Sequence, residues 1–417
     1  MKKFKSGLAL ALASLLLLNA CSNKSNTESS TKKEDEKTAV EESKEIEESE
    51  KETSKETKVE KKNPYERPTI QPTIWTSDFD DPNYNIKGIE KVENLGLITG
   101  DGSHNKTRER FRVGGTDLGI PVIHNNKLYL WFGDTFYGDF AGDPMAGGLW
   151  RSNFLAITED FDLSDGLDIE DVIGNETKKD KVAKELVFSK KIPESEHTVI
   201  PTGSLSLNGK LYVYFMSVNR WGTPGRWDIN YGGLAVSDDD GESFKKIESF
   251  ELDPEKFGQF SCIEIGDYIY GIGLGGGRFG NAYLARVKKD EIEDVSKYEY
   301  LVSELGAEPE FAPSPENASK IITMPVGEPS IMYNEYLGEY MITYLNEAKR
   351  AVVMRTAKEL WMPWSDELVI ASGDNFPGLY CGFVHPDLTE ENGKIFYFIM
   401  SQASPVYNSI LFKAYLK

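Results

Sequence analysis

The feature that most constrains this fold is a unit of two apolar strands joined by a tight polar turn, which occurs five times. The copies read GIPVIHNNKLYLWFGD, TGSLSLNGKLYVYFMS, FSCIEIGDYIYGIGLG, PSIMYNEYLGEYMITYL and GFVHPDLTEENGKIFYFIMS. Asn208-Gly209 is the strongest turn signal among them, because a type I′ hairpin needs positive φ at both central residues. The sequence therefore predicts an irregular repeat of β-hairpins.

A third strand-like segment follows most hairpins, and a fourth often comes next, as at residues 184–192 and 366–372. Repeats that each contain about four strands are typical of a β-propeller. We therefore expect an all-β fold, a five-bladed β-propeller. The last copy has no fourth strand of its own before Lys417, and residues 86–99 could supply one and close the ring. A two-sheet β-sandwich would also give many short strands and is the structural alternative.

The segment SDDDGESF, from Ser237 to Phe244, supports the propeller independently. It resembles the Asp-box pattern Ser-x-Asp-x-Gly-x-Thr-Trp of sialidase-type propellers. Asp239 can bond backbone amides while Gly241 adopts a positive φ, so the motif predicts a turn between outer strands and no catalytic role.

The first residues have the pattern of an export signal. Three lysines precede an apolar run from Gly7 to Leu18, which is too short to span a bilayer, and the run ends at Leu-Asn-Ala-Cys. This resembles a bacterial lipoprotein signal, which implies removal of residues 1–20 and attachment of lipid, palmitate included, to Cys21. The chain would then be anchored to the extracytoplasmic face of the cell membrane. An ordinary secretory signal with a chance cysteine is the alternative.

Residues 21–62 combine the modified cysteine with a segment rich in Glu, Lys, Ser and Thr that has no aromatic residue. Such a segment cannot bury enough apolar surface to fold, so we expect a disordered tether. Residues 63–417 form the predicted folded domain.

The chain has a formal net charge of −21. The lysines of the signal contribute +3 and residues 22–62 contribute −3, so the folded domain also carries −21. This charge disfavours nucleic acid and anionic lipid as partners of the domain, which leaves the lipid anchor as the contact with the membrane. An uncharged polysaccharide or oligosaccharide remains compatible, and we expect a monomer.

Cysteine and histidine are too sparse for a structural zinc site. Cys262 and Cys381 could pair in a disulfide, but they do not suggest a cysteine-stapled scaffold. The acidic run EDFDLSDGLDIED fails the spacing of a helix-loop-helix calcium site. We expect no cofactor and no protein-built metal site, and a calcium ion in the propeller channel stays open.

Two aspartates flank the first hairpin. If it turns at Asn125-Asn126 without a bulge, Asp117 and Asp134 face each other with Cβ atoms about 4.5 to 5.5 Å apart. Two carboxylates that close raise one pKa, which suits acid/base work on a glycosidic bond. Alternatively, each aspartate could simply bond amides of its own turn.

Several segments together are similar to the bacterial domain-of-unknown-function family 4185, part of which is glycoside hydrolase family 183, endo-D-arabinanases on five-bladed propellers. The segments are GGTDLGIPV, LYLWFGDTF, IPTGS, GGRFGNAYLARV and GEPSIMYNEYLGEYMITY, and the likeness covers residues 85–417. The resemblance implies that Asp117 and Asp134 are the candidate catalytic aspartates.

Glu328 is a third candidate catalytic residue, at the start of the inner strand of the fourth repeat. Five-bladed furanosidases generally carry a catalytic glutamate on a different blade from the base. A partner of Asp117 about 6.5 to 9.5 Å away would predict inversion, and one about 5 Å away retention. A carboxylate that only bonds backbone in the channel is the alternative for Glu328.

Aromatic and polar side chains near the predicted channel could bind sugar, because aromatic faces stack on sugar rings and Arg or Asp binds hydroxyls. A glycine run before Arg278 lets backbone approach a ligand closely. The two histidines could equally be satisfied locally, and Trp221 could pack between blades. The candidate substrate-binding residues are His197, Trp221, Arg226, Trp227, Asp228, Arg278, Asn281 and His385.

The sequence thus favours a surface-anchored glycoside hydrolase acting on a furanoside-containing, arabinan-like polysaccharide. A non-catalytic glycan-binding lipoprotein would use the same channel without turnover. A purely adhesive propeller would tolerate replacement of the aspartates. Fold does not decide among these, because propellers host many functions.

Overall fold

The computed structural model describes residues 71–73, 76–138 and 148–417. The predicted signal of residues 1–20, the lipidation site Cys21 and the tether of residues 21–62 lie outside the described residues and stay predictions. No helix within the described part is long and apolar enough to cross a membrane. Strands dominate the described chain, with one five-residue α-helix, which confirms the all-β prediction.

The first two hairpin repeats form two four-stranded antiparallel sheets. The first contains β4 (Leu118–His124), β5 (Lys127–Phe132), β6 (Phe154–Thr158) and β7 (Asp171–Val172). The second contains β10 (Thr198–Leu207), β11 (Lys210–Trp221), β12 (Trp227–Ser237) and β13 (Lys245–Lys246). The turn between β10 and β11 has φ of 53° at Asn208 and 75° at Gly209, as the Asn-Gly pair predicts.

The predicted strand at residues 184–192 does not form, and β7 is the fourth strand instead. The reason is that side chains satisfy the backbone here. The Asn153 Oδ1 atom accepts the amides of Leu186 and Val187, and Glu185 accepts the amides of Ser152 and Ser189. These groups are therefore not available to a strand ladder.

The next repeats merge into one nine-stranded sheet. Its main path contains β14 (Gln259–Ile265), β15 (Tyr268–Leu274), β16 (Gly280–Lys288), β19 (Lys320–Asn334), β20 (Glu339–Asn346), β21 (Ala351–Ala357) and β22 (Leu368–Ser372). The short strands β17 (Glu299–Leu301) and β18 (Phe311–Ala312) extend from β16. The first half of β19 pairs with β16 and its second half pairs with β20, so β19 joins two repeats.

The last sheet is seven-stranded and combines both ends of the described chain. It contains β1 (Gln71–Thr73), β2 (Ser77–Asp78), β3 (Gly88–Leu97), β23 (Leu379–Phe383), β24 (Thr389–Glu390), β25 (Ile395–Gln402) and β26 (Asn408–Leu416). β3 lies antiparallel to β26, with Val92 opposite Ala414. This pairing confirms that the segment around residues 86–99 supplies the strand that the last repeat lacks.

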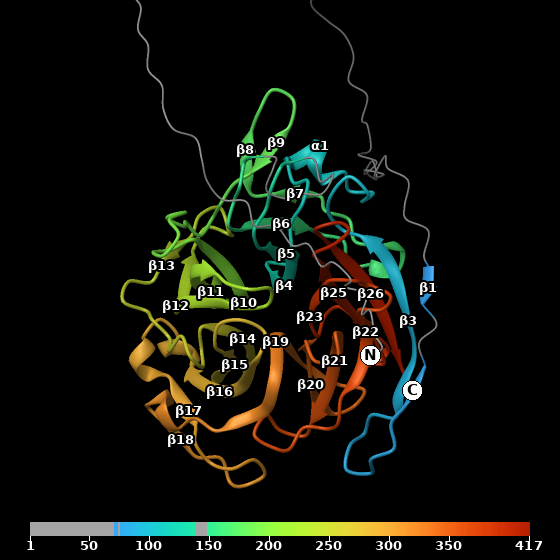
Figure 1. Ribbon diagram of the computed structural model, residues 1–417, viewed down its shortest axis with the longest axis vertical. Helices are drawn as coiled ribbons and strands as arrows, with labels where there is room; N and C mark the ends of the chain where they lie inside the picture. The colour runs from blue at the N-terminus through green and yellow to red at the C-terminus, as the bar shows by residue number, and fades with distance from the viewer. Residues whose placement is uncertain (1–70, 74–75, 139–147) are drawn as a thin grey trace, which may run out of the picture. The chain divides into compact units, whose positions relative to one another are not determined.

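The first strands of the five hairpins converge. Figure 1 shows β4, β10, β14, β19 and β23 nearest the middle of the folded unit. Contacts run from β4 to β10, β14, β19 and β23 in turn, and from β23 back to β4. These inner strands therefore form a closed cycle around one axis.

The remaining elements are short. They are the helix α1 (Thr107–Phe111), the hairpin β8 (Gly174–Glu176) with β9 (Lys181–Ala183), and the 3-10 turns η1 (Leu163–Asp165), η2 (Lys289–Glu291), η3 (Val295–Lys297), η4 (Pro315–Asn317) and η5 (Glu391–Gly393).

The Asp-box turn forms as predicted between β12 and β13. Asp239 accepts the amide of Ser243, Ser237 accepts the amide of Gly241, and Gly241 has φ of 90°. Phe244, at the end of the motif, packs edge-on against Trp131 of the neighbouring sheet with ring centroids 4.8 Å apart. The turn thus contributes to packing between sheets. Burial of each such large apolar side chain stabilises the fold by about 1.5 to 3 kcal/mol.

Candidate active site

Register irregularities occur in four of the five inner strands, at the start of β4, in the middle of β10 and β19, and within the short β23. The ladder shifts between Leu118 and Ile120 in β4, Pro201 and Gly203 in β10, Gly327 and Ser330 in β19, and Tyr380 and Phe383 in β23. Three non-glycine residues there have positive φ: Leu118 at 68°, Glu328 at 38° and Cys381 at 51°. Such conformations cost about 1 to 3 kcal/mol each and bulges re-aim side chains, so these positions are site candidates.

The first of these bulges overturns the predicted pairing of the two aspartates. Leu118 lies opposite Phe132, whereas Ile120 lies opposite Trp131. Gly119, with φ of 105°, absorbs the extra residue. The Gly133 amide then donates to the Asp117 carbonyl at 3.2 Å, so Asp117 lies opposite Gly133 and not opposite Asp134.

Asp134 follows β5 and is buried, with an exposed fraction of 7%. Its Oδ1 atom accepts hydrogen bonds from Trp150 Nε1 and Thr198 Oγ1, both at 2.7 Å. Burial raises the pKa of Asp134 to about 6, although these two bonds and the charge of Lys191 favour the carboxylate. Asp134 is therefore a buried carboxylate whose anion is well supported.

Asp117 precedes β4 and is half-buried. Its Oδ2 atom accepts a hydrogen bond from the Tyr380 hydroxyl at 2.9 Å, and the Tyr407 hydroxyl also bonds to this carboxyl. Its Oδ1 atom is buried and has no hydrogen-bond partner among the described residues. Burial, and then the charge of Asp134, raise the pKa of Asp117 to about 7. The two aspartates thus influence each other even though the bulge separates them in register.

Glu328 lies at the bulge inside β19, where this strand passes from β16 to β20. Its Oε1 atom accepts a hydrogen bond from Arg278 Nε at 2.7 Å, whereas Oε2 is buried without a partner in the described part of the chain. Burial raises the pKa of Glu328, and Arg278 opposes this shift. A second carboxylate oxygen, Oε1 of Glu347, lies 3.9 Å from Arg278 Nη1.

Tyr380 connects the two carboxyl groups Asp117 and Glu328. The guanidinium of Arg278 lies over the Tyr380 ring, 4.2 Å from the centroid, while the hydroxyl donates to Asp117. Because Arg278 also bonds Glu328, the named contacts form a chain from Asp117 to Glu328. The structure thus joins Asp117 and Glu328 in one network of contacts, and Asp134 acts on Asp117 through its charge.

Some predicted binding residues lie beside this network. His197 contacts the Trp150 ring edge-on, with centroids 5.5 Å apart, and burial lowers its pKa. The Trp227 ring is buried, and the guanidinium carbon of Arg278 lies over it, 5.6 Å from the ring centroid. The exposed Trp221 packs edge-on against Trp227. These rings could form walls of a sugar site.

Other predicted binding residues serve different contacts. Asp228 is exposed and pairs with Arg220 at 2.6 Å. Arg226 stacks over the Phe279 ring at 4.1 Å. The Asn281 side chain accepts the amide of Met324, a local backbone role. The geometry gives these three no contact with the carboxylates.

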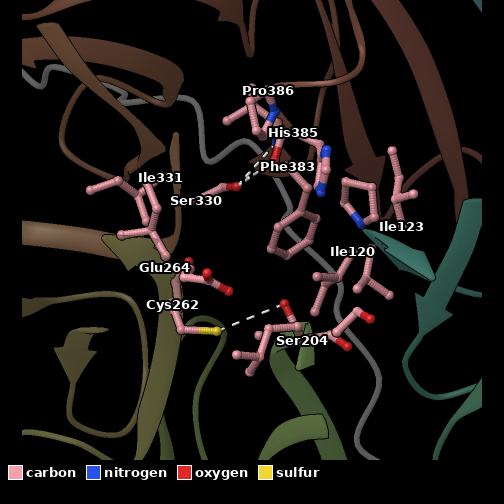
Figure 2. A pocket seen from close by; sticks show the side chains of 18 of the residues that line it. Ile120, Ile123, Ser204, Cys262, Glu264, Ser330, Ile331, Phe383, His385 and Pro386 are labelled. Carbon is pink, nitrogen blue, oxygen red and sulfur yellow. Dashed lines mark hydrogen bonds between the residues drawn. The ribbon is translucent and has the colours of Figure 1, made fainter. Parts of the chain in front are cut away.

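His385 lines a separate cavity of about 370 Å³ at the other end of the inner strands. Figure 2 shows this cavity with Ile120, Ser204 and Cys262 in its wall. Its lining includes none of the three predicted catalytic residues. β23 runs from Tyr380 toward His385 at about 3.3 Å per residue, which carries His385 about 15 Å from the Asp117 end. His385 therefore lies apart from the three candidate catalytic residues, and its role in substrate binding stays a prediction.

The suggested disulfide does not form, because Cys262 and Cys381 are both free thiols. No group of three or more His, Cys, Asp or Glu side chains within residues 71–73, 76–138 and 148–417 could hold a metal ion. In the acidic run EDFDLSDGLDIED, Asp168 Oδ1 bonds His104 Nε2 at 2.8 Å.

Sequence reasoning missed the side chains that hold the carboxyls, namely Tyr380, Tyr407, Trp150 and Thr198. Thr198 and Tyr380 lie on inner strands that begin a few residues before the predicted repeat copies, which start at Thr202 and Gly382. Tyr407 and Trp150 lie between strands, where the repeat gives no register.

A family model described as "Domain of unknown function (DUF4185)" matches residues 102–413. No curated protein sequence matches the chain significantly. A Bacteroides ovatus protein provisionally named a hydrolase has a similar structure, with a TM-score of 0.54 and 15% identity over 78% of this chain and 90% of that chain.

Weaker likenesses extend to enzymes. A Bombyx mori GH32 β-fructofuranosidase has a TM-score of 0.43 and 13% identity over 73% of this chain and 62% of that chain. A family 117 glycoside hydrolase of Zobellia galactanivorans has a TM-score of 0.42 and 13% identity, covering 83% and 90%. Sequence identities this low are evidence about the fold and not about the activity.

Proposed function

The chain belongs to the DUF4185 family, and on this premise we propose that it is a glycoside hydrolase built on a five-bladed β-propeller. The closed cycle of five inner strands supports this blade number, with the nine-stranded sheet counted as two blades joined through β16 and β19. A two-sheet sandwich has no such cycle.

The observation that carries the proposal is the pair Asp117 and Asp134. Both carboxyls have pKa values raised toward neutrality, and each is held by different neighbours. Glycoside hydrolysis needs one carboxyl that is protonated and one that is ionised at the same pH. Asp117, with the higher pKa, is the general acid, and Asp134, with two donors on one oxygen, is the base or nucleophile.

Glu328 assists these two groups. Arg278 occupies its Oε1 atom, and its Oε2 atom is left to accept a hydrogen bond from a sugar hydroxyl. Such bonds can strengthen as charge develops on the sugar ring in the transition state. The aromatic walls of Trp221 and Trp227 beside Arg278 support sugar binding in the same place.

The substrate class follows from family resemblance and charge. We favour a furanoside-containing, arabinan-like polysaccharide, and the acidic domain suits an uncharged glycan better than an anionic one. Lipid attachment at Cys21 would hold a monomer at the extracytoplasmic face of the membrane, where such polymers are met. Metabolic labelling with a palmitate analogue, compared between the wild type and Cys21→Ala, tests the anchor.

The deciding experiment is release of oligosaccharides by the purified protein from arabinans, other furanosides and bacterial wall polysaccharides. We expect cleavage of at least one polymer by the wild type, with loss in Asp117→Asn and Asp134→Asn. The anomeric configuration of the first product, read by NMR, separates retention from inversion. Binding of one polymer without any cleavage would replace the hydrolase by a glycan-binding protein.

A further inference from the structure

The two oxygens of Asp117 have different surroundings. Oδ2 accepts the Tyr380 hydroxyl at 2.9 Å, and Oδ1 is buried with no partner in the described part of the protein. Burial and the charge of Asp117 raise the pKa of Tyr380 well above its ordinary value, so this hydroxyl keeps its proton and can donate. The Tyr380 hydroxyl therefore remains a donor to Oδ2.

Gly133 makes room for the unpartnered oxygen. A Cβ atom at Gly133 would lie 2.3 Å from Asp117 Oδ1, closer than real Cβ contacts allow. The bulge at Gly119 is what places Gly133 opposite Asp117. With Asp134 at that register position, as an unbulged hairpin would have it, a side chain would occupy this space.

Tyr380 is itself held from the opposite side. Arg278 lies 4.2 Å above its ring, and Arg278 is fixed by the hydrogen bond to Glu328. The ring is buried, with an exposed fraction of 3%. Its hydroxyl therefore has one direction in which to donate.

We propose that Tyr380 is a positioning residue that assigns the catalytic proton of Asp117 to Oδ1. The assignment rests on the proposed hydrolase function. Oδ2 already accepts the hydrogen of the Tyr380 hydroxyl. A carboxyl proton on Oδ2 would face that hydrogen, so Oδ1 is the better site for it. The proton is thus held on Oδ1, the buried oxygen that has no hydrogen-bond partner in the described part of the protein.

The chemical step follows from this placement. The Oδ1–H bond breaks and its proton passes to the glycosidic oxygen, while the bond from that oxygen to the anomeric carbon breaks and its electron pair stays with the leaving alcohol. The anomeric carbon accepts an electron pair from Asp134 or from water that Asp134 deprotonates. Asp117 becomes a carboxylate, which the Tyr380 hydroxyl stabilises on Oδ2.

Tyr380→Phe tests the proposal on the full chain by removing this donor and little else. We expect kcat to fall about tenfold with KM nearly unchanged, because one hydrogen bond to a charged group is lost. The alkaline limb of the pH profile should move to higher pH, because the lost bond lowers the pKa of Asp117 in the wild type. Tyr212→Phe is the matched control, because its hydroxyl bonds Glu293 at 2.8 Å away from this site.

Gly133→Ala tests the other half of the geometry. The added methyl group displaces Oδ1 without removing any functional group, and we expect kcat to fall about a hundredfold, the scale of a general acid that is out of place. Circular dichroism and thermal unfolding check that the variant is folded.

A ¹³C NMR titration of aspartate carboxyls, with the Asp117 signal identified from Asp117→Asn, does not depend on turnover. A higher pKa of Asp117 in Tyr380→Phe with no hydrolysis by the wild type would keep the geometric assignment and remove the hydrolase. An unchanged titration and an unchanged alkaline limb would overturn the role of Tyr380 even in an active enzyme.

Discussion

The two ends of the inner strands are built from the same five strands but differ in backbone and in charge. At the first end, which holds Asp117 and Glu328, four ladders are irregular, and each of these half-buried residues has one oxygen without a partner among the described residues. At the other end the ladders are regular, and Glu264 is half exposed and paired with Lys289. Figure 2 shows the second end as a cavity whose wall includes Ile120, Ile331, Ser204 and His385.

This difference shows that position on the central axis does not by itself make a catalytic site. Both ends carry carboxylates. Only the first end combines desolvation, mutual repulsion and backbone strain, which together shift pKa values and aim side chains. The predictions below test whether that combination divides the two ends in function.

The largest expected effect is at the first end. Asp117→Asn and Asp134→Asn should each lower kcat/KM by about 10² to 10⁴, the contribution typical of a general acid or base. Product release under identical conditions measures it. Glu264→Gln is the control from the second end and should retain full activity, so a comparable loss in Glu264→Gln would erase the distinction.

Glu328→Gln should have the next largest effect, a loss of about 10 to 100-fold in kcat/KM, because a hydrogen bond to a charged group contributes about 1.5 to 3 kcal/mol. The melting temperature should also fall, since Arg278 loses its nearest counter-charge. Glu347, 3.9 Å away, limits this destabilisation. Normal activity in Glu328→Gln, measured beside thermal unfolding, would restrict its role to structure.

The pH dependence of kcat/KM tests the two aspartates of the first end. Activity requires protonated Asp117 and ionised Asp134, so kcat/KM should fall as pH rises above about 7 and as it falls below about 6. These apparent pKa values belong to the coupled pair. A pH-rate profile that is flat from pH 5 to 8 would contradict the assignment.

Because Asp117 is buried, the stability of the folded protein should also depend on pH, in a direction that the pKa shift of Asp117 determines. The folded pKa of Asp117 lies above its ordinary value of 3.8, so its contribution is most favourable below about pH 4 and is lost as pH rises through about 7. Asparagine does not ionise, so Asp117→Asn should not lose stability as the pH rises in this range. Its gain in melting temperature over the wild type should be larger at pH 8 than at pH 5, and Glu264→Gln should show no such trend.

The smallest effect is expected for His385→Ala at the second end. His385 accepts the amide of Asp387 and lines a cavity that excludes the catalytic residues. We expect kcat/KM within about twofold of the wild type, as for substitutions away from a functional feature. A loss of tenfold or more would mean that the two ends communicate.

Sequence predicted the parts of this molecule that local chemistry determines. Asn208-Gly209 fixes its hairpin, Gly241 fixes the Asp-box turn, and the missing outer strand of the last repeat pointed to β3. These features depend on residues a few positions apart, or on a count of strands.

The site was predictable only as a set of carboxylates. The bulge at Leu118 and Gly119 was not predictable, because one extra residue in a ladder leaves the apolar pattern of the hairpin intact. Tyr380 is 263 residues from Asp117, and its contact with the carboxyl depends on how two repeats pack. The same bulge that spoiled the predicted register is what leaves space at Gly133 for the oxygen of Asp117.

The pairing of β3 with β26 affects how the protein is made. Glu93 and Tyr415, which bond across this pair, are 322 residues apart. During synthesis β3 emerges early and keeps an unpaired edge until nearly the whole chain has been translated, and exposed edges invite pairing with other chains. Closing so long a loop is also slow. Folding of the ring therefore has to finish late, and the yield of active protein should depend on protection of the nascent chain during that wait.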